Sequence, residues 1–158
     1  MKKAQGLRAA IVAQLPEFET EPDRLKIWVE DGSASCTLTP DESFQISYRL
    51  NVLLVEMRSD IALLALAVFR WLRVNQPDLM VPPATGFSFE ADVLDNKTAD
   101  IVLQLDLDEC VAVTPREDGG SDLNYLDEPD PLFDDEQGVG DPDVVPDLAG
   151  HFTLEDAE

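Results

Sequence analysis

The sequence predicts an α+β domain, in which a mostly antiparallel or mixed sheet of about five strands packs one face against two helices. Two segments place apolar residues at helical spacing, and five others alternate apolar and polar residues. The connections between them are short, which favours antiparallel neighbours. The expected order is one helix, three strands, a second helix and two strands, and a crossover through the second helix leaves room for one parallel pair.

The helices are predicted from their apolar stripes and their end signals. Residues 3–15 carry a short apolar stripe, and Pro16 ends it because proline cannot continue a helix. A second helix is expected to begin at a cap on Ser59 or Asp60 and to run to Gln76.

The strands are predicted from alternation between turn signals. Asp31-Gly32 predicts a hairpin turn between the first two strands, and residues 95–97 predict the turn between the last two. The predicted strands span residues 25–30, 33–39, 44–57, 87–94 and 98–107, with residues 111–113 extending the last one past a bulge.

The second predicted helix has less polar surface than a surface helix needs. Arg70 and Arg73 mark a polar face near its end, but at helical spacing that face continues back into Leu66, Leu63 and Ala62. Either a loop covers this helix or the helix lies in a subunit interface, and the pattern leaves both interpretations open.

Aromatic and arginine side chains on or near this helix are candidate contacts for a partner, because both types are enriched at interface hot spots. Trp71 is the first candidate, with a core position at the helix end as the alternative. The complete set of interface candidates is Trp71, Arg70, Arg73, Leu66, Ala62 and Trp28.

Charge divides the chain into two parts. The net charge is −22 at pH 7, and 15 of the 33 acidic residues but none of the 11 basic ones lie from Glu117 onward. Residues 1–116 are therefore predicted to fold, and residues 117–158 to form an acidic, largely disordered tail, because such a composition cannot offset the entropy of ordering. Apolar islands such as Leu123 leave docking on a partner as the alternative to a solvated tail.

No catalytic set, cofactor site or metal site is expected. His151 is the single histidine and lies in the acidic tail, and neither a phosphate loop nor a dinucleotide fingerprint is present. The acidic balance also argues against binding to nucleic acid. The last hairpin carries a row of aspartates that suits a solvated strand face, with a divalent cation or a hydrolytic pair as the alternative; they are Asp92, Asp95, Asp100, Asp106 and Asp108.

Synthesis in the cytoplasm, with no export signal, is expected. The start of the chain resembles a signal peptide only faintly, because polar residues interrupt the stretch after it. Residues 61–69 form an apolar run too short to span a bilayer. Cys36 and Cys110 are expected to be small buried side chains in a reducing compartment, with a strand-to-strand disulfide as the alternative.

Two segments resemble signatures of a known family. Residues 69–79 read FRWLRVNQPDL and are similar to a WLR-x-x-QPDL pattern. Residues 89–101 contain Phe89, Ala91 and Leu94-Asp95-Asn96, followed by Thr98 and Asp100, and are similar to F-x-A-x-x-LDN-x-T-x-D. Both patterns resemble the tail completion protein R family of contractile-tailed, P2-like coliphages, and the resemblance extends over residues 1–115.

The resemblance implies a structural, non-enzymatic protein of the virion tail, assembled in the host cytoplasm. Such proteins resemble tail terminators, which form a ring, taken to be a hexamer, at the head-proximal end of the tail. The ring would cap the tube and the sheath and join the neck, so the implied partners are further copies of the chain, the tube protein, and neck and sheath proteins. DNA would pass the lumen without specific binding.

Two other functions remain open from the sequence alone. The strong negative charge is also typical of a small acidic protein-binding module or a nucleic-acid mimic. The aspartates of the last predicted hairpin leave a metal-dependent hydrolase as the second rival.

Overall fold

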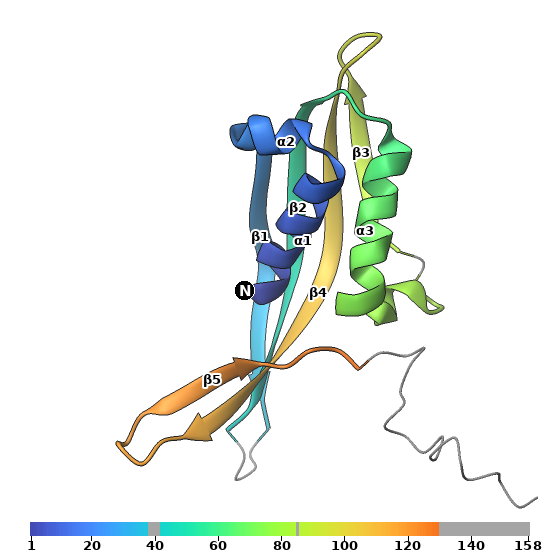
Figure 1. Cartoon of the computed structure of the whole chain (residues 1–158). Coiled ribbons are helices and arrows are strands. Elements are labelled where there is room, and N and C mark those ends of the chain that lie inside the picture. The colour runs from blue at the N-terminus through green and yellow to red at the C-terminus, as the bar shows by residue number, and fades with distance from the viewer. Residues whose placement is uncertain (38–41, 85, 130–158) are drawn as a thin grey trace, which may run out of the picture.

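The computed structural model describes residues 1–37, 42–84 and 86–129 (Figure 1). Most of the predicted acidic tail, residues 130–158, lies outside this part of the chain. The helical segments are α1 (Lys2–Gln14), α2 (Glu17–Thr20) and α3 (Ile61–Asn75), with 3₁₀ turns η1 (Pro22–Arg24) and η2 (Pro77–Met80). The strands are β1 (Leu25–Cys36), β2 (Phe44–Met57), β3 (Ser88–Val93), β4 (Ala99–Pro115) and β5 (Ser121–Tyr125).

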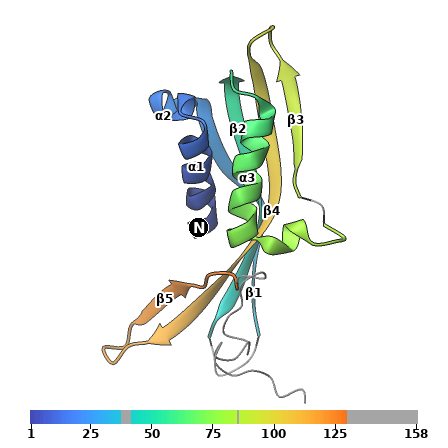
Figure 2. The same cartoon turned by 45° about the vertical axis from the view of Figure 1, so that its right-hand side comes forward.

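The five strands form one antiparallel sheet with the order β1-β2-β4-β3, and β5 pairs with the far end of β4. Helices α1 and α3 lie side by side on one face of this sheet (Figure 2). This arrangement confirms the predicted α+β fold. The described strands contain no parallel pair, because β3 pairs with β4, the strand that follows it, and not with β2.

The core lies between the two helices and the middle of the sheet. Alternate residues of β2 and β4 point at the helices, as the period of two predicted. Full burial of one such aliphatic side chain stabilises the fold by about 1.5–3 kcal/mol. The fully buried members include Leu7, Ile11, Leu50, Val52, Leu54, Leu64, Val68, Leu72 and Leu103.

The predicted hairpin turn at Asp31-Gly32 is wrong. Strand β1 continues through these residues and pairs with β2 on both sides of them, with a register shift between Glu30 and Ser33. Asp31 has a φ of 50°, so the Asp-Gly pair forms a bulge within one strand instead of reversing the chain. The first two predicted strands are therefore one long edge strand.

The fifth strand lies in a segment for which the sequence predicted disorder. Strand β4 runs to Pro115, and residues 121–125 pair back onto it as β5. The turn between them is closed by the Arg116 amide, which donates to the Gly120 carbonyl at 2.8 Å, and Gly119 adopts a φ of 84°. The sequence signal was missed because β5 is short and mostly polar.

Both cysteines are exposed, so the prediction that they are buried is wrong. Cys36 is the last residue of β1, and Cys110 lies within β4. Cys36 pairs with Phe44 and Cys110 with Gln45, so β2 separates them and they point to opposite faces of the sheet. Both are free, and the alternative disulfide is not formed.

Within the described residues, none of the helices combines the length and the apolar composition that crossing a bilayer requires.

Candidate interaction surfaces

Helix α3 is held at both ends by side chains that the sequence supplies locally. The Asp60 carboxylate accepts the Ala62 amide at 2.8 Å, which confirms the predicted cap. At the other end Gln76 is 3% exposed, and its amide oxygen accepts from the Lys3 ammonium at 2.7 Å and from the Asp108 amide at 3.2 Å. These bonds connect the end of α3 to α1 and β4, so the helix has a fixed position on the sheet.

Trp71 lies in the core. It is 7% exposed, and its indole Nε1 stands 3.1 Å from where a Cβ on Gly6 would be. The absence of a side chain at Gly6 therefore allows α1 to approach the ring of Trp71. This position matches the alternative interpretation of Trp71 as a core residue, and little of its surface is left for a partner.

The outer face of α3 is apolar and exposed. Leu63, Leu66 and Phe69 are 41%, 40% and 37% exposed, and Ala62, Arg70 and Arg73 are exposed with them. Of the two interpretations of this helix, a covering loop is not what the described residues show. Among the described residues, Gly86 and Phe87 approach the edge of the stripe at Phe69, whose ring lies 5.2 Å from the ring of Phe87.

A second apolar row lies beside this helix on β3. Phe89 is 51% exposed, Val93 is 72% exposed, and Ala91 between them is also exposed. Phe89 pairs with Leu103 and Ala91 with Ile101, both of which belong to the core, so this row points to the helix side of the sheet. We call the surface made by Leu63, Leu66, Phe69, Phe89, Ala91 and Val93 the α3–β3 face.

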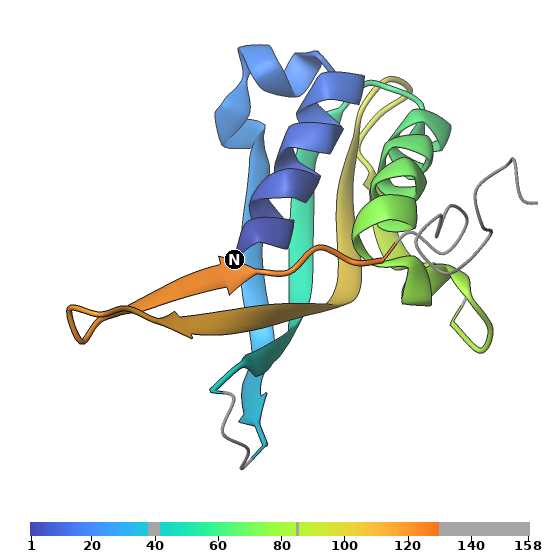
Figure 3. The same ribbon diagram turned by 60° about the horizontal axis from the view of Figure 1, so that its bottom comes forward.

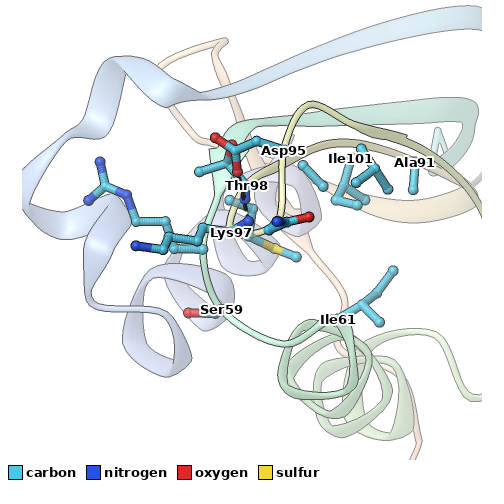
Figure 4. Close-up of a pocket in the computed structure, with 12 residues that line it drawn as sticks. Ser59, Ile61, Ala91, Asp95, Lys97, Thr98 and Ile101 are labelled. Carbon is cyan, nitrogen blue, oxygen red and sulfur yellow. Dashed lines mark hydrogen bonds between the residues drawn. The ribbon is translucent and has the colours of Figure 1, made fainter.

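An open groove lies at the end of this face that is next to the β3–β4 hairpin (Figure 4). It has a volume of about 660 Å³ and lies between the start of α3 and the β3–β4 hairpin. Ile61 lines it from the helix, and Ala91 and Ile101 line it from the strands. The apolar surface is therefore concave here.

The hairpin that borders the groove is closed by Asp95, as predicted. Its carboxylate accepts the amides of Lys97 at 2.7 Å and Thr98 at 2.8 Å. The backbone bond from Lys97, with those from Thr98, holds the pKa of the Asp95 carboxyl below its usual value. The Leu-Asp-Asn-x-Thr part of the second signature thus has a structural role.

Two other aspartates of this hairpin, Asp100 and Asp106, have side-chain partners within the chain. Asp100 accepts the Glu56 amide at 2.7 Å, where Glu56 has a φ of 50° and interrupts the ladder of β2. Asp106 pairs with Arg49 at 3.0 Å, and Arg49 also pairs with Asp31 at 3.1 Å. In residues 1–37, 42–84 and 86–129, no three His, Cys, Asp or Glu side chains are grouped to hold a metal ion.

Trp28 lies on the face of the sheet that the helices leave open. It is 39% exposed, its indole donates to Glu30 at 3.0 Å, and it pairs across the strands with Asn51. Asn51 is 1% exposed and accepts from Gln104 at 3.1 Å. The interface candidates of the sequence therefore fall on two opposite surfaces, since Trp28 does not share a face with Leu66.

A buried carboxylate that sequence reasoning missed joins the N-terminus to the sheet. Glu109 is 2% exposed, and its two oxygens each accept one backbone amide at 3.0 Å, from Lys2 and from Lys3. The Tyr48 hydroxyl donates to the same carboxylate. Burial, with the adjacent Glu109 carboxylate, raises the pKa of the Tyr48 phenol far above its usual range. Glu109 follows the buried alternate residues of β4, and a charge at a core position was the available signal.

Two lysines hold the segment after β5 against α1. The Lys2 ammonium pairs with Asp127 at 2.5 Å, and the Lys3 ammonium pairs with Glu128 at 2.7 Å. Lys3 is 7% exposed, so its pair is shielded from solvent better than that of Lys2. We call Glu109, Lys2, Lys3, Asp127 and Glu128 the N-terminal clasp.

Exposed apolar surfaces of this kind are typical of the class of proteins that work through contacts with other proteins, here on an α+β domain. Residues 1–129 match the family described as P2 phage tail completion protein R (GpR). The tail completion protein R of Escherichia phage P2 is 37% identical over 134 residues, which cover 83% of this chain and 86% of the relative. The chain therefore belongs to the P2 phage tail completion protein R family, as its two signatures indicated. No solved structure matches it significantly.

Proposed function

We propose that this chain is a structural tail terminator. It forms a ring, a hexamer in this proposal, at the head-proximal end of a contractile tail, where it caps tube and sheath polymerisation and becomes part of the neck. Membership of the tail completion family supports the structural role in the tail. The partners would be further copies of the chain, the tube protein, and neck and sheath proteins.

The main observation in support of a ring is the exposed α3–β3 face. Apolar side chains on one helix and one neighbouring strand form a contiguous, partly concave surface. Large exposed apolar patches typically mark contacts with other proteins. A ring would cover this face in every subunit, whereas a monomer would leave it in water.

The negative charge of the chain supports a ring lumen through which DNA passes without binding. The residues before Glu117 carry 18 acidic and 11 basic side chains, and the rest of the chain adds only acidic ones. A negative surface repels phosphates. We propose that the acidic tail, residues 117–158, either docks on a neck or sheath protein or keeps unassembled subunits apart by repulsion.

Tube growth in vitro tests the proposal. Tail tube protein is polymerised with and without this chain, and tube lengths are measured by electron microscopy while light scattering follows the free chain. We expect capped tubes of restricted length. The variant Leu66→Asp should lose capping, whereas the control Val29→Asp, which changes a 37% exposed residue of the edge strand β1 away from the α3–β3 face, should retain it.

Two outcomes would contradict the proposal. One is a chain that stays monomeric and leaves tube length unchanged at every salt concentration. The other is specific capture of basic host proteins without any effect on tubes, which would favour the acidic binding module instead.

A further inference from the structure

The end of β4 and β5 form a two-stranded ribbon that projects from the domain (Figure 3). Beyond Val111, β4 no longer pairs with β2. Its one strand partner among the described residues is β5, and the Val113 amide also donates to the Ser43 hydroxyl at 3.4 Å. We call this ribbon, residues 112–124, the arm. An isolated two-stranded ribbon is marginally stable in water. An arm of this kind is therefore expected to gain stability from a surface that covers it.

The arm is amphipathic. Val113 pairs with Leu123 and Pro115 with Ser121, so these four residues share one face. The opposite face is mostly polar, with Thr114, Asp122 and Asn124 beside Ala112. Leu123 is 59% exposed. The apolar face of the arm therefore has no complete cover among the described residues.

The root of the arm is fixed to the domain by the N-terminal clasp. The terminal ammonium of Met1 donates to the Tyr125 hydroxyl at 3.2 Å, and the Leu126 amide donates to the Cys110 carbonyl at 2.9 Å. The ion pairs of Lys2 and Lys3 follow directly after these contacts. The clasp thus gives the arm a defined direction of exit.

That direction leads away from the α3–β3 face of the same chain. In Figures 1 and 3 the arm projects on one side of α1, and α3 lies on the other side. One chain therefore presents an apolar ribbon and an apolar receiving surface at two separate places. Two different complementary patches make a heterologous contact, which closes into a ring when the rotation between subunits permits.

We propose that the arm of one copy packs its apolar face on the α3–β3 face of the next copy. This inference rests on the proposed ring and names the contact that builds it. Leu123 and Val113 of one subunit would cover Leu66 and Phe69 of its neighbour.

Charge complementarity favours a second copy as the occupant. Arg70 and Arg73 are exposed beside the apolar stripe, and neither forms an ion pair within residues 1–37, 42–84 and 86–129. The tip of the arm carries Glu117 and Asp118, and its one basic residue, Arg116, pairs with Asp118 at 3.3 Å and with Asp122 at 3.6 Å, so the arm keeps a net negative charge. An acidic tip would approach a basic helix end, and salt should weaken this part of the contact.

A disulfide between two different chains tests the contact directly. Full-length chains carry Cys36→Ser and Cys110→Ser, because both native cysteines are exposed. One chain adds Leu123→Cys and the other Leu66→Cys, and they are mixed on polymerised tail tubes and oxidised. We expect a cross-linked dimer from the mixture and none from either chain alone. The control pair, Leu123→Cys with Val29→Cys on the edge strand β1, should not cross-link.

A complementation experiment tests the same contact without cysteines. Leu123→Asp removes a competent arm and Leu66→Asp removes a competent face, so each variant alone should lose self-association by at least about tenfold, as expected for a buried contact residue. Mixed together, they retain one good arm and one good face per pair, and a mixed dimer should form. Asn124→Asp, on the other face of the arm, should behave like the wild-type chain.

The outcomes separate this inference from the proposed function. If the wild-type chain caps tubes while the mixed cysteine chains do not cross-link, the arm contact is wrong and the terminator proposal stands. Cross-linking of the Leu123→Cys chain with itself would also overturn the inference, because it indicates a symmetric contact. A wild-type chain that does not cap tubes at all overturns the proposed function.

Discussion

Replacing Glu109 by glutamine should destabilise the domain strongly, although the change is nearly isosteric. The carboxylate is 2% exposed and accepts two amides at the start of α1 and the hydroxyl of Tyr48. Loss of a helix cap costs about 0.5–2 kcal/mol. A hydrogen bond to a charged acceptor contributes about 1.5–3 kcal/mol. Glutamine keeps one acceptor oxygen, so we expect the free energy of unfolding to fall by about 2–4 kcal/mol.

Urea unfolding followed by tryptophan fluorescence measures this loss. Trp71 is 7% exposed and should report the loss of the core. The midpoint should fall while the slope of the free energy against urea stays unchanged. Glu90→Gln on β3 is the matched control, because Glu90 is exposed and the same chemical change should leave the midpoint in place. An unchanged midpoint in Glu109→Gln would refute the role of this carboxylate as a buried cap.

Three further predictions concern stability. The pKa of the Tyr48 phenol is raised above its ordinary value of 10.0, so above this pH the folded state keeps the proton while the unfolded chain loses it. The free energy of unfolding should therefore fall as the pH rises above 10. Denaturation of Tyr48→Phe across this range should show a smaller fall. Asp60→Ala removes the cap of α3 and should cost about 1 kcal/mol, measured by thermal unfolding with circular dichroism; no change would contradict the capping role. Leu64→Ala should cost about 2–5 kcal/mol in urea, whereas Leu63→Ala on the exposed face should cost far less; equal losses would mean that the two faces of α3 are misassigned.

Local pattern was sufficient for several features of the fold. The period of two in β2 and β4 and the helical period in α1 and α3 identified these four elements. Asp60 and the Asp95 turn were predicted because a cap and a tight turn depend on residues a few positions apart. The apolar outer face of α3 was also visible as a pattern, since helical spacing alone places Ala62 and Leu66 together.

Features that depend on distant partners were not predictable in this way. An Asp-Gly pair such as Asp31-Gly32 fits a hairpin turn and a bulge equally well. Here it forms a bulge because β1 pairs with β2 on both sides of it. Trp71 belongs to a residue type that is common at interfaces, but it is buried because α1 approaches its ring at Gly6.

The N-terminal clasp and β5 show the same division most clearly. Glu109 meets Lys2 and Lys3 across more than a hundred residues of chain, and no local pattern carries that distance. Strand β5 has little apolar content of its own, and its order comes from backbone pairing with β4. The sequence by itself determined which segments carry an apolar side and where the Asp60 cap and the Asp95 turn lie, because these features depend on residues a few positions apart. The tertiary structure alone decided which distant segment covers each apolar side, and thereby which apolar surfaces remain exposed.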